Sequence, residues 1–241
     1  MNKRIVFCGT PEIASQVLKS LYQNGYQIEC VYTQPPVASH RGQKINKSPV
    51  HLISETLNLP VRTPASLNNE EEKNFLKNLN LALCVTIAYG QIIKKDFLNI
   101  PKYGWVNVHY SLLPKFRGAS PVQRAIMEGE TTTGISIMQM NEGIDTGSIC
   151  NQYSINILDN ENSEELASRL STLASEKILE NIDDIFKGKA IFKEQDHNKA
   201  TYAKKIDKSE GKISWNNDTA KKIIGKINGL YPFPGAFFIY K

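Results

Sequence analysis

Short apolar runs alternate with amphipathic segments through the first 150 residues of the chain. The apolar runs are rich in β-branched residues and predict buried strands at 3–8, 28–33 and 81–88. The segments between them have apolar residues at helical spacing and predict helices at 10–23, 49–57 and 69–78. Strands that alternate with helices in this way predict an α/β fold built on a doubly wound, mostly parallel sheet.

The pattern changes toward the end of the chain. Apolar residues at helical spacing predict one long covering helix over 162–187. A charged linker follows, and 218–228 predicts a short basic helix. The strand-like segment 236–240 (AFFIY) then needs sheet partners that the one remaining residue cannot supply. We therefore expect a main domain at 1–200, and at 201–241 a linker with the opening of an incomplete second domain.

Composition is typical of an ordinary globular protein. The 241 residues are 41% hydrophobic and 22% charged, which is enough apolar side chain for a core and argues against disorder. No window approaches the ~18–20 apolar residues of a membrane helix, and the N-terminus shows no signal peptide. Cys8, Cys30, Cys84 and Cys150 are too far apart for zinc-finger spacing. We expect a cytoplasmic protein without metal, disulfides or membrane contact.

Positive charge gathers in two stretches of the chain. The net charge is +5, and residues 201–241 hold eight lysines against three carboxylates. Arg41, Lys44 and Lys47 form a second basic group within residues 30–54, where no carboxylate occurs. Such groups attract phosphate-bearing partners through a salt-dependent force. A solvated, lysine-rich surface is the alternative.

Candidate chemistry concentrates between residues 104 and 147. Asn107 and His109 alternate with valines, so on a strand the two polar side chains share one face, about 7 Å apart along the backbone. In open α/β sheets, ligands bind beyond the carboxyl ends of the strands. Asn107 and His109 lie at the carboxyl end of their predicted strand, so they are placed where a ligand would bind. The first strand is followed by Gly9 alone, without G-x-G-x-x-G or a P-loop, which disfavours dinucleotide and nucleotide sites.

Each of these residues also has a plainer interpretation. An isolated histidine is more often a surface or core residue than a catalyst. Asn107 could serve only to satisfy backbone groups. Asp145, in the loop 141–147 (NEGIDTG), could be a turn-forming aspartate. The residue types alone therefore leave both interpretations open.

Longer motifs carry a family resemblance. The runs N-V-H-Y-S-L-L-P-K-F-R-G-A-S-P (107–121) and T-G-I-S-I-M-Q-M-N-E-G-I-D-T-G (133–147) resemble the formyltetrahydrofolate-dependent formyltransferases. The runs F-C-G-T-P-E, K-S-P-V, A-Y-G-Q-I and L-Y-P-F-P-G-A, at 7–12, 47–50, 88–92 and 230–236, are similar to the branch that acts on methionyl-tRNA. The resemblance implies a Rossmann-like formyltransferase domain, followed by a β-barrel-like tRNA-binding domain of which only the opening is present.

The resemblance also implies roles for particular residues. Asn107, His109 and Asp145 would be catalytic, with Asn107 and His109 stabilising negative charge on the formyl oxygen and Asp145 assisting proton transfer. Arg41, Lys44 and Lys47 would contact tRNA. The cosubstrate 10-formyltetrahydrofolate would be bound by Ser111, Leu112, Leu113 and Pro114, and by Ala88, Tyr89, Gly90, Gln91 and Ile92. Pro36 and Tyr110 depart from the residues expected in the family at those positions.

The function implied is transfer of a formyl group from 10-formyltetrahydrofolate to the amino group of initiator methionyl-tRNA, by a monomer that needs no metal. A sugar-nucleotide amine N-formyltransferase is the nearest alternative, since it would use the same Asn, His and Asp. A truncated remnant that binds folate or tRNA without catalysis is a third possibility.

Overall fold

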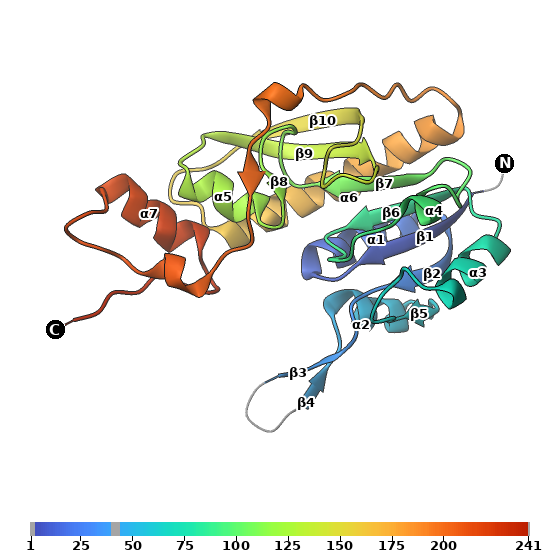
Figure 1. Cartoon of the computed structure of the whole chain (residues 1–241), viewed down its shortest axis with the longest axis horizontal. Coiled ribbons are helices and arrows are strands. Elements are labelled where there is room, and N and C mark those ends of the chain that lie inside the picture. Colours follow the sequence, from blue (N-terminus) through green and yellow to red (C-terminus); the bar gives the residue numbers. More distant parts are fainter. Residues whose placement is uncertain (1–2, 40–43, 241) are drawn as a thin grey trace.

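The computed structural model describes residues 3–39 and 44–240, and one mixed sheet forms the centre of that part (Figure 1). The strand order in this sheet is β10-β9-β7-β6-β1-β2-β5. Neighbouring strands from β5 to β7 run parallel, whereas β9 is antiparallel to β7 and β10 is antiparallel to β9. The doubly wound, mostly parallel sheet is therefore confirmed. Its strands are β1 (Arg4–Gly9), β2 (Gln27–Tyr32), β5 (Val61–Arg62), β6 (Leu83–Ile87), β7 (Trp105–His109), β9 (Thr132–Gln139) and β10 (Ile149–Asn156).

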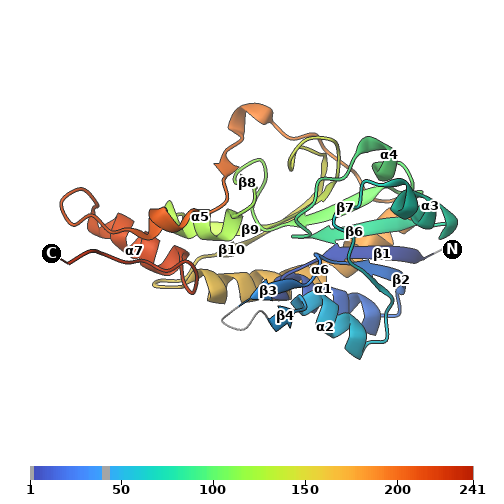
Figure 2. The same ribbon diagram turned by 60° about the horizontal axis from the view of Figure 1, so that its bottom comes forward.

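Helices cover both faces of the sheet (Figure 2). On one face, α1 (Glu12–Gln23) and α6 (Ser163–Phe186) bury their apolar sides against Ile5, Phe7 and Val85. On the other, α3 (Glu70–Asn78) and α4 (Lys95–Leu98) pack over Val6, Cys8 and other residues that alternate with the first set. The alternation of strand side chains between two cores explains why the central strands read as continuous apolar runs.

The long helix α6 begins and ends where the sequence predicts. The Asn162 side chain accepts the backbone N–H groups of Glu164 and Glu165, and the Glu165 carboxylate accepts the Asn162 N–H in return. This capping box satisfies amides that the first helical turn leaves without partners. Buried residues such as Leu166 and Ile178 then follow at helical spacing along the side that faces the sheet.

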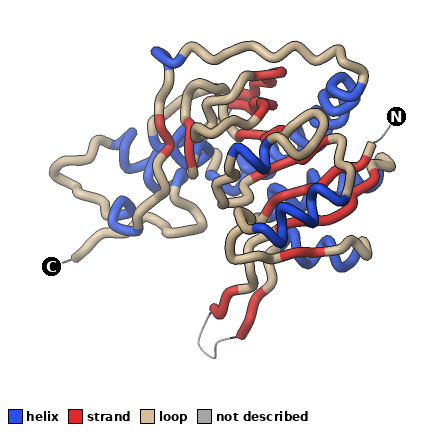
Figure 3. The backbone as a smooth tube through the Cα atoms, turned by 45° about the vertical axis from the view of Figure 1, so that its right-hand side comes forward, coloured by secondary structure: helices blue, strands red, loops and turns tan. Residues whose placement is uncertain are grey.

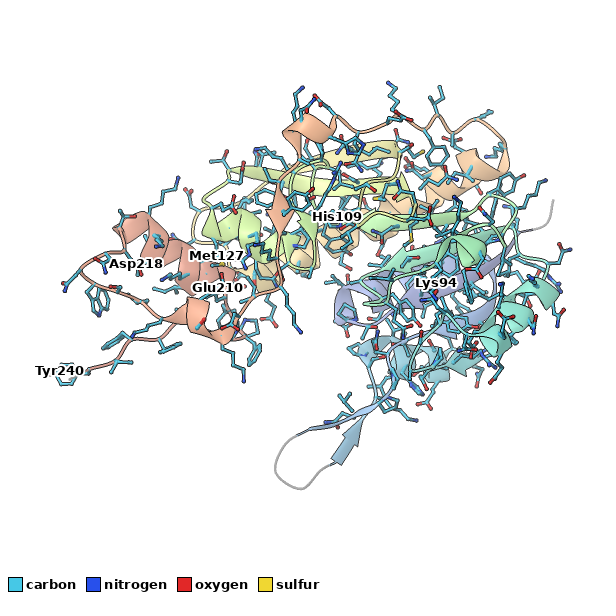
Figure 4. All side chains as sticks on the ribbon, in the orientation of Figure 1. Lys94, His109, Met127, Glu210, Asp218 and Tyr240 are labelled. Carbon is cyan, nitrogen blue, oxygen red and sulfur yellow. The ribbon has the colours of Figure 1, made fainter. Side chains whose placement is uncertain are left out.

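The last forty residues form a small unit beside the sheet, most of it loop (Figure 3). Its helix α7 (Ala220–Gly229) crosses α5 (Pro121–Met127) at close range. A Cβ atom on Gly225 would lie 2.9 Å from the Met127 carbonyl oxygen, so a larger residue there would separate the two helices. Arg124 on α5 also pairs with Glu210, and Met127, Glu210 and Asp218 all lie in or against this unit (Figure 4).

Three local features are defined by the structure beyond the sequence pattern. Residues 236–240 do not form a strand: Phe237 alone makes a single bridge, to Lys212, because the described residues offer this segment no further sheet partner. The segment between β2 and α2 (Pro49–Thr56) holds a short hairpin of β3 (Val37–Ser39) and β4 (Lys44–Asn46). Pro11 occupies the N-cap of α1 without a side-chain hydrogen bond, and the hydroxyl of the preceding Thr10 donates to the Tyr89 carbonyl oxygen. Within residues 3–39 and 44–240, no helix has the length and apolar character that crossing a membrane requires.

Candidate active site

A cavity of about 620 Å³ opens at the carboxyl ends of β1, β6 and β7. The parallel register places Cys8 beside Thr86 and Thr86 beside Asn107, so these strands end along one edge of the sheet. The cavity wall includes Asn107, His109 and Asp145 among mainly apolar neighbours. This combination of volume, apolar lining and few polar groups is typical of small-molecule sites. A second hollow, of about 730 Å³, lies beside Tyr103 and Phe192 and borders none of those three residues.

Asn107 and His109 lie on the same face of β7, as predicted, and both approach Asp145. The Asn107 amide nitrogen is 3.5 Å from Asp145 Oδ1, and His109 Nδ1 is 3.5 Å from Asp145 Oδ2. The backbone N–H of Gly118 donates to Asp145 Oδ2 at 2.8 Å. Thus the structure brings the three predicted catalytic residues together, and it adds Gly118 to them (Figure 4 marks His109).

The hydrogen bonds of His109 distinguish its two ring nitrogens. Nε2 lies 2.8 Å from the carbonyl oxygen of Phe116, and a carbonyl can only accept, so we assign a proton to Nε2. Nδ1 faces the Asp145 carboxylate. In the imidazolium form both N–H groups therefore have an acceptor. Nδ1 is the nitrogen that can exchange a proton while the backbone contact through Nε2 persists.

Three residues around the cavity have left-handed backbone conformations. Ala88, Phe116 and Asp145 have φ angles of 45°, 59° and 50°. Such conformations cost about 1–3 kcal/mol for residues other than glycine and persist only where surrounding contacts hold them. Two of the three, Ala88 and Asp145, line the cavity. Backbone strain of this kind is common at functional sites, where it fixes the direction of a side chain or carbonyl.

One of the two segments predicted to bind the folate cosubstrate lines the cavity along its whole length. It runs from Ala88 through Tyr89, Gly90 and Gln91 to Ile92. The Gln91 amide is not free to contact a ligand, since it accepts from the Leu67 N–H and donates to the Pro64 carbonyl oxygen. Tyr89 is buried, and burial raises the pKa of its hydroxyl above the ordinary value. Backbone groups and the Ile92 side chain are therefore what this segment offers to a ligand.

The second predicted folate segment lies elsewhere. None of Ser111, Leu112, Leu113 and Pro114 borders the cavity. Two hydrogen bonds connect this segment to Ser136 on β9. The Ser136 hydroxyl accepts the Leu113 N–H and donates to the Ser111 carbonyl oxygen. The Gln152 amide also donates to the Leu113 carbonyl oxygen. The folate contact of these four residues thus stays a prediction.

The basic group predicted to contact tRNA is only partly described. Arg41 lies outside the described residues, and Lys44 begins β4 of the hairpin. Lys47 is exposed and pairs with Glu55 on α2 (Pro49–Thr56), with 2.5 Å between Nζ and Oε1. This carboxylate follows directly after the acid-free stretch and neutralises part of its charge.

Sequence reasoning missed the residues that hold Asp145 in place. Gly118, on β8 (Arg117–Gly118), donates to the Asp145 carboxylate, and Gln195 donates to the Asp145 carbonyl oxygen. The R-G pair within F-R-G-A-S-P was a signal for the first of these, whereas nothing near Gln195 marks the second.

The part of the chain that the structure describes holds no group of three His, Cys, Asp or Glu side chains that could bind a metal ion.

Comparisons with known proteins identify the family of the chain. The formyl transferase family model matches residues 3–182, and the model of its C-terminal domain matches 205–241. The methionyl-tRNA formyltransferase of Pelagibacter ubique is 58% identical over the whole chain, which covers 78% of that protein. The methionyl-tRNA formyltransferase of Phenylobacterium zucineum is 40% identical over 98% of the chain and is covered to 76%.

Solved structures share the fold at lower identity. A 4-N formyltransferase from Francisella tularensis superposes with a TM-score of 0.78 at 20% identity, covering 99% of this chain and 93% of its own. The N-formyltransferase from Helicobacter canadensis, solved with folinic acid and dTDP-3-aminofucose, gives 0.71 at 22% identity over 95% of this chain and 80% of its own. Through its family matches and its relatives above 30% identity, the chain belongs to the formyl transferase family, in its methionyl-tRNA formyltransferase branch.

Proposed function

We propose that the protein transfers the formyl group of 10-formyltetrahydrofolate to the amino group of initiator methionyl-tRNA, for translation initiation. The observation that carries the proposal is the meeting of Asn107, His109 and Asp145 at a ligand-sized cavity, in a chain 58% identical to a methionyl-tRNA formyltransferase. We propose two functional units, a catalytic domain at 1–200 and a linker with part of a tRNA-binding domain at 201–241.

The cavity fits a folate cosubstrate by volume and lining. When bound, 10-formyltetrahydrofolate supplies the formyl carbon and a nitrogen that leaves with the electrons of the broken C–N bond. Asn107 has two amide hydrogens, and one of them can donate to the formyl oxygen as negative charge develops there. A preorganised donor of this kind contributes about 3–4 kcal/mol to the stability of a transition state.

His109 and Asp145 would move the protons. The attacking amine must lose a proton and the leaving nitrogen must gain one, so one group that accepts and returns a proton serves both steps. His109 Nδ1 can do this, while Asp145 Oδ2, held by the Gly118 N–H, stabilises the charged ring. The Nδ1–Oδ2 separation of 3.5 Å is at the long limit of a hydrogen bond, so Nδ1 stays available for a substrate proton while the carboxylate stabilises the ring through its charge.

The choice of acceptor is directly testable. We expect formyl transfer to initiator methionyl-tRNA, and none above background to dTDP-linked amino sugars, when both are offered with 10-formyltetrahydrofolate. Quantitative mass spectrometry of the formylated products measures both reactions in one assay. Turnover of the amino sugar alone would instead identify a sugar N-formyltransferase, and saturable folate binding without either product would identify a non-catalytic binding protein.

The basic group of Arg41, Lys44 and Lys47 gives a second prediction. Replacing Arg41, Lys44 and Lys47 together by alanine should raise KM for tRNA and leave the affinity for folate unchanged. Because Lys47 already pairs with Glu55, we expect the slope of log affinity against log salt to flatten by about 2 rather than 3 units. Filter binding of tRNA across a salt series measures this slope.

A matched triple variant controls for net charge. Lys77 lies on α3, Lys177 on α6 and Lys187 at the C-cap of α6, and replacing these three lysines by alanine also removes three positive charges. The salt slope of this variant should remain close to that of the wild type. Equal slopes in the two triple variants would show that the hairpin is an ordinary solvated surface.

A further inference from the structure

The turn that carries Asp145 is held by a side chain from a distant segment. The Gln195 amide nitrogen donates to two backbone carbonyl oxygens of this turn, to that of Asp145 at 2.9 Å and to that of Gly147 at 2.7 Å. Gln195 is only 6% exposed, so these bonds are shielded from water. One amide thus bridges the carbonyls on either side of Thr146.

Arg117 fixes the orientation of that amide. Its Nε and Nη2 atoms both donate to Gln195 Oε1, at 3.1 and 2.6 Å, and Nη2 also lies 3.1 Å from His197 Nδ1. A guanidinium group can only donate, so Oε1 must face Arg117 and the amide nitrogen must face the turn. The opposite orientation of the Gln195 amide would place two sets of donors against each other.

The burial of Arg117 is unusual for a charged residue. The side chain is 2% exposed, and among the described residues no carboxylate lies within ion-pair distance of it. Burying a cation against neutral acceptors is costly, and a neutral residue would avoid that cost. The contacts of the guanidinium show what it does at this cost, which is to orient the Gln195 amide.

We propose that Arg117 and Gln195 are positioning residues that set the catalytic geometry of Asp145. Gln195 holds the Asp145 carbonyl while the neighbouring Gly118 N–H holds its carboxylate, so the residue is fixed at both ends in its left-handed conformation. The carboxylate is thereby kept facing His109 Nδ1 and the Asn107 amide. The proposal rests on the proposed function, in which Asp145 assists proton transfer.

The variant Gln195→Glu separates positioning from stability. A glutamate there can accept from Arg117 as an ion pair, which preserves the buried contact, but it cannot donate to the two carbonyls of the turn. We expect the thermal unfolding midpoint to stay within a few degrees of that of the wild type. We expect kcat to fall at least ~10-fold, with KM for tRNA and folate within twofold, because only the group acting in the transition state is displaced.

Two alanine variants, Gln195→Ala and Asn181→Ala, test whether a loss of kcat comes from general destabilisation. Asn181 is also a buried amide, 1% exposed, but it bonds Tyr153 and Lys177 on the far side of the sheet. Both alanine variants should lower the unfolding midpoint, and only Gln195→Ala should lower kcat. A loss of kcat in Asn181→Ala equal to that in Gln195→Ala would assign the effect to general destabilisation and overturn the proposal.

A readout without substrate keeps this test independent of the proposed function. The ¹⁵N chemical shifts of the His109 ring report its partners, and we expect them to differ between the wild type and Gln195→Glu at the same pH. Altered shifts in a protein that formylates no acceptor would support the positioning role and contradict the proposed function. Unchanged His109 shifts, or a kcat for Gln195→Glu within twofold of the wild type, would overturn the positioning role.

Discussion

Replacing His109 by alanine is expected to lower kcat for formyl transfer at least ~100-fold. The ring is 6% exposed, borders the cavity, and is fixed by Phe116 on one side and Asp145 on the other. The variant loses the group that exchanges protons with the amine and the leaving nitrogen, a contribution of ~100- to 10,000-fold for general acid–base catalysis. Asn107→Ala and Asp145→Ala should cause losses of similar size.

Single-turnover kinetics with saturating tRNA and folate measure the chemical step directly. In each of the three variants kcat and kcat/KM should fall together, because the lost interaction is made in the transition state. His51→Ala is a suitable control, since His51 lies on α2 away from the cavity. A His109→Ala enzyme within tenfold of the wild type would refute the assignment of His109.

Gly147→Ala is expected to damage both the fold and the site. A Cβ atom at this position would lie 1.7 Å from the Gln139 carbonyl oxygen, which belongs to the end of β9. That oxygen cannot move away freely, because the Gln139 N–H is bonded to the Ser148 carbonyl oxygen. We expect the free energy of unfolding to fall by about 3 kcal/mol. We also expect kcat to fall at least ~100-fold, because the turn holding Asp145 must shift.

Gly143→Ala in the same loop is the matched control. Its Cβ atom would lie 2.1 Å from Thr146 Oγ1, a side-chain contact that a change of rotamer relieves at the cost of the hydroxyl's hydrogen bond to Asn141. We therefore expect a loss of about 1 kcal/mol in urea unfolding, well below that of Gly147→Ala, and a kcat much closer to that of the wild type than Gly147→Ala gives. Equal unfolding midpoints for the two alanine variants would show that the loop tolerates the displacement at Gly147.

The central sheet could be predicted from the sequence because its strands are buried on both faces. In β1 and β6 nearly every residue is enclosed, so the apolar runs were long and unbroken. Asn107 and His109 were placed on one face by the two-residue period of a strand, which is a local property. Residues 236–240 have the same apolar character but lack sheet partners, and they form no strand.

The remaining features of the site depend on contacts between distant parts of the chain. Residues 111–114, which follow β7, do not border the cavity, and Leu113 of this segment bonds Ser136, 23 residues away in sequence. Gln195 meets Asp145 across 50 residues of sequence. Nearer in sequence, Lys47 forms an ion pair with Glu55, which lies just outside the acid-free stretch. No periodicity or spacing in the sequence encodes these contacts, so they emerge only from the folded chain.

The contacts of residues 195–203 also determine when the site can form during synthesis. Thr201 bonds the Phe116 N–H, and β11 (Tyr202–Ala203) pairs with β8, the strand that holds the Asp145 carboxylate. A nascent chain that ends before Gln195 already contains Asn107, His109 and Asp145 but lacks these supports. At ~5–20 residues per second, roughly 5 to 20 s separate the synthesis of His109 from that of Ala203. The sheet can therefore assemble on the ribosome several seconds before the enzyme becomes competent.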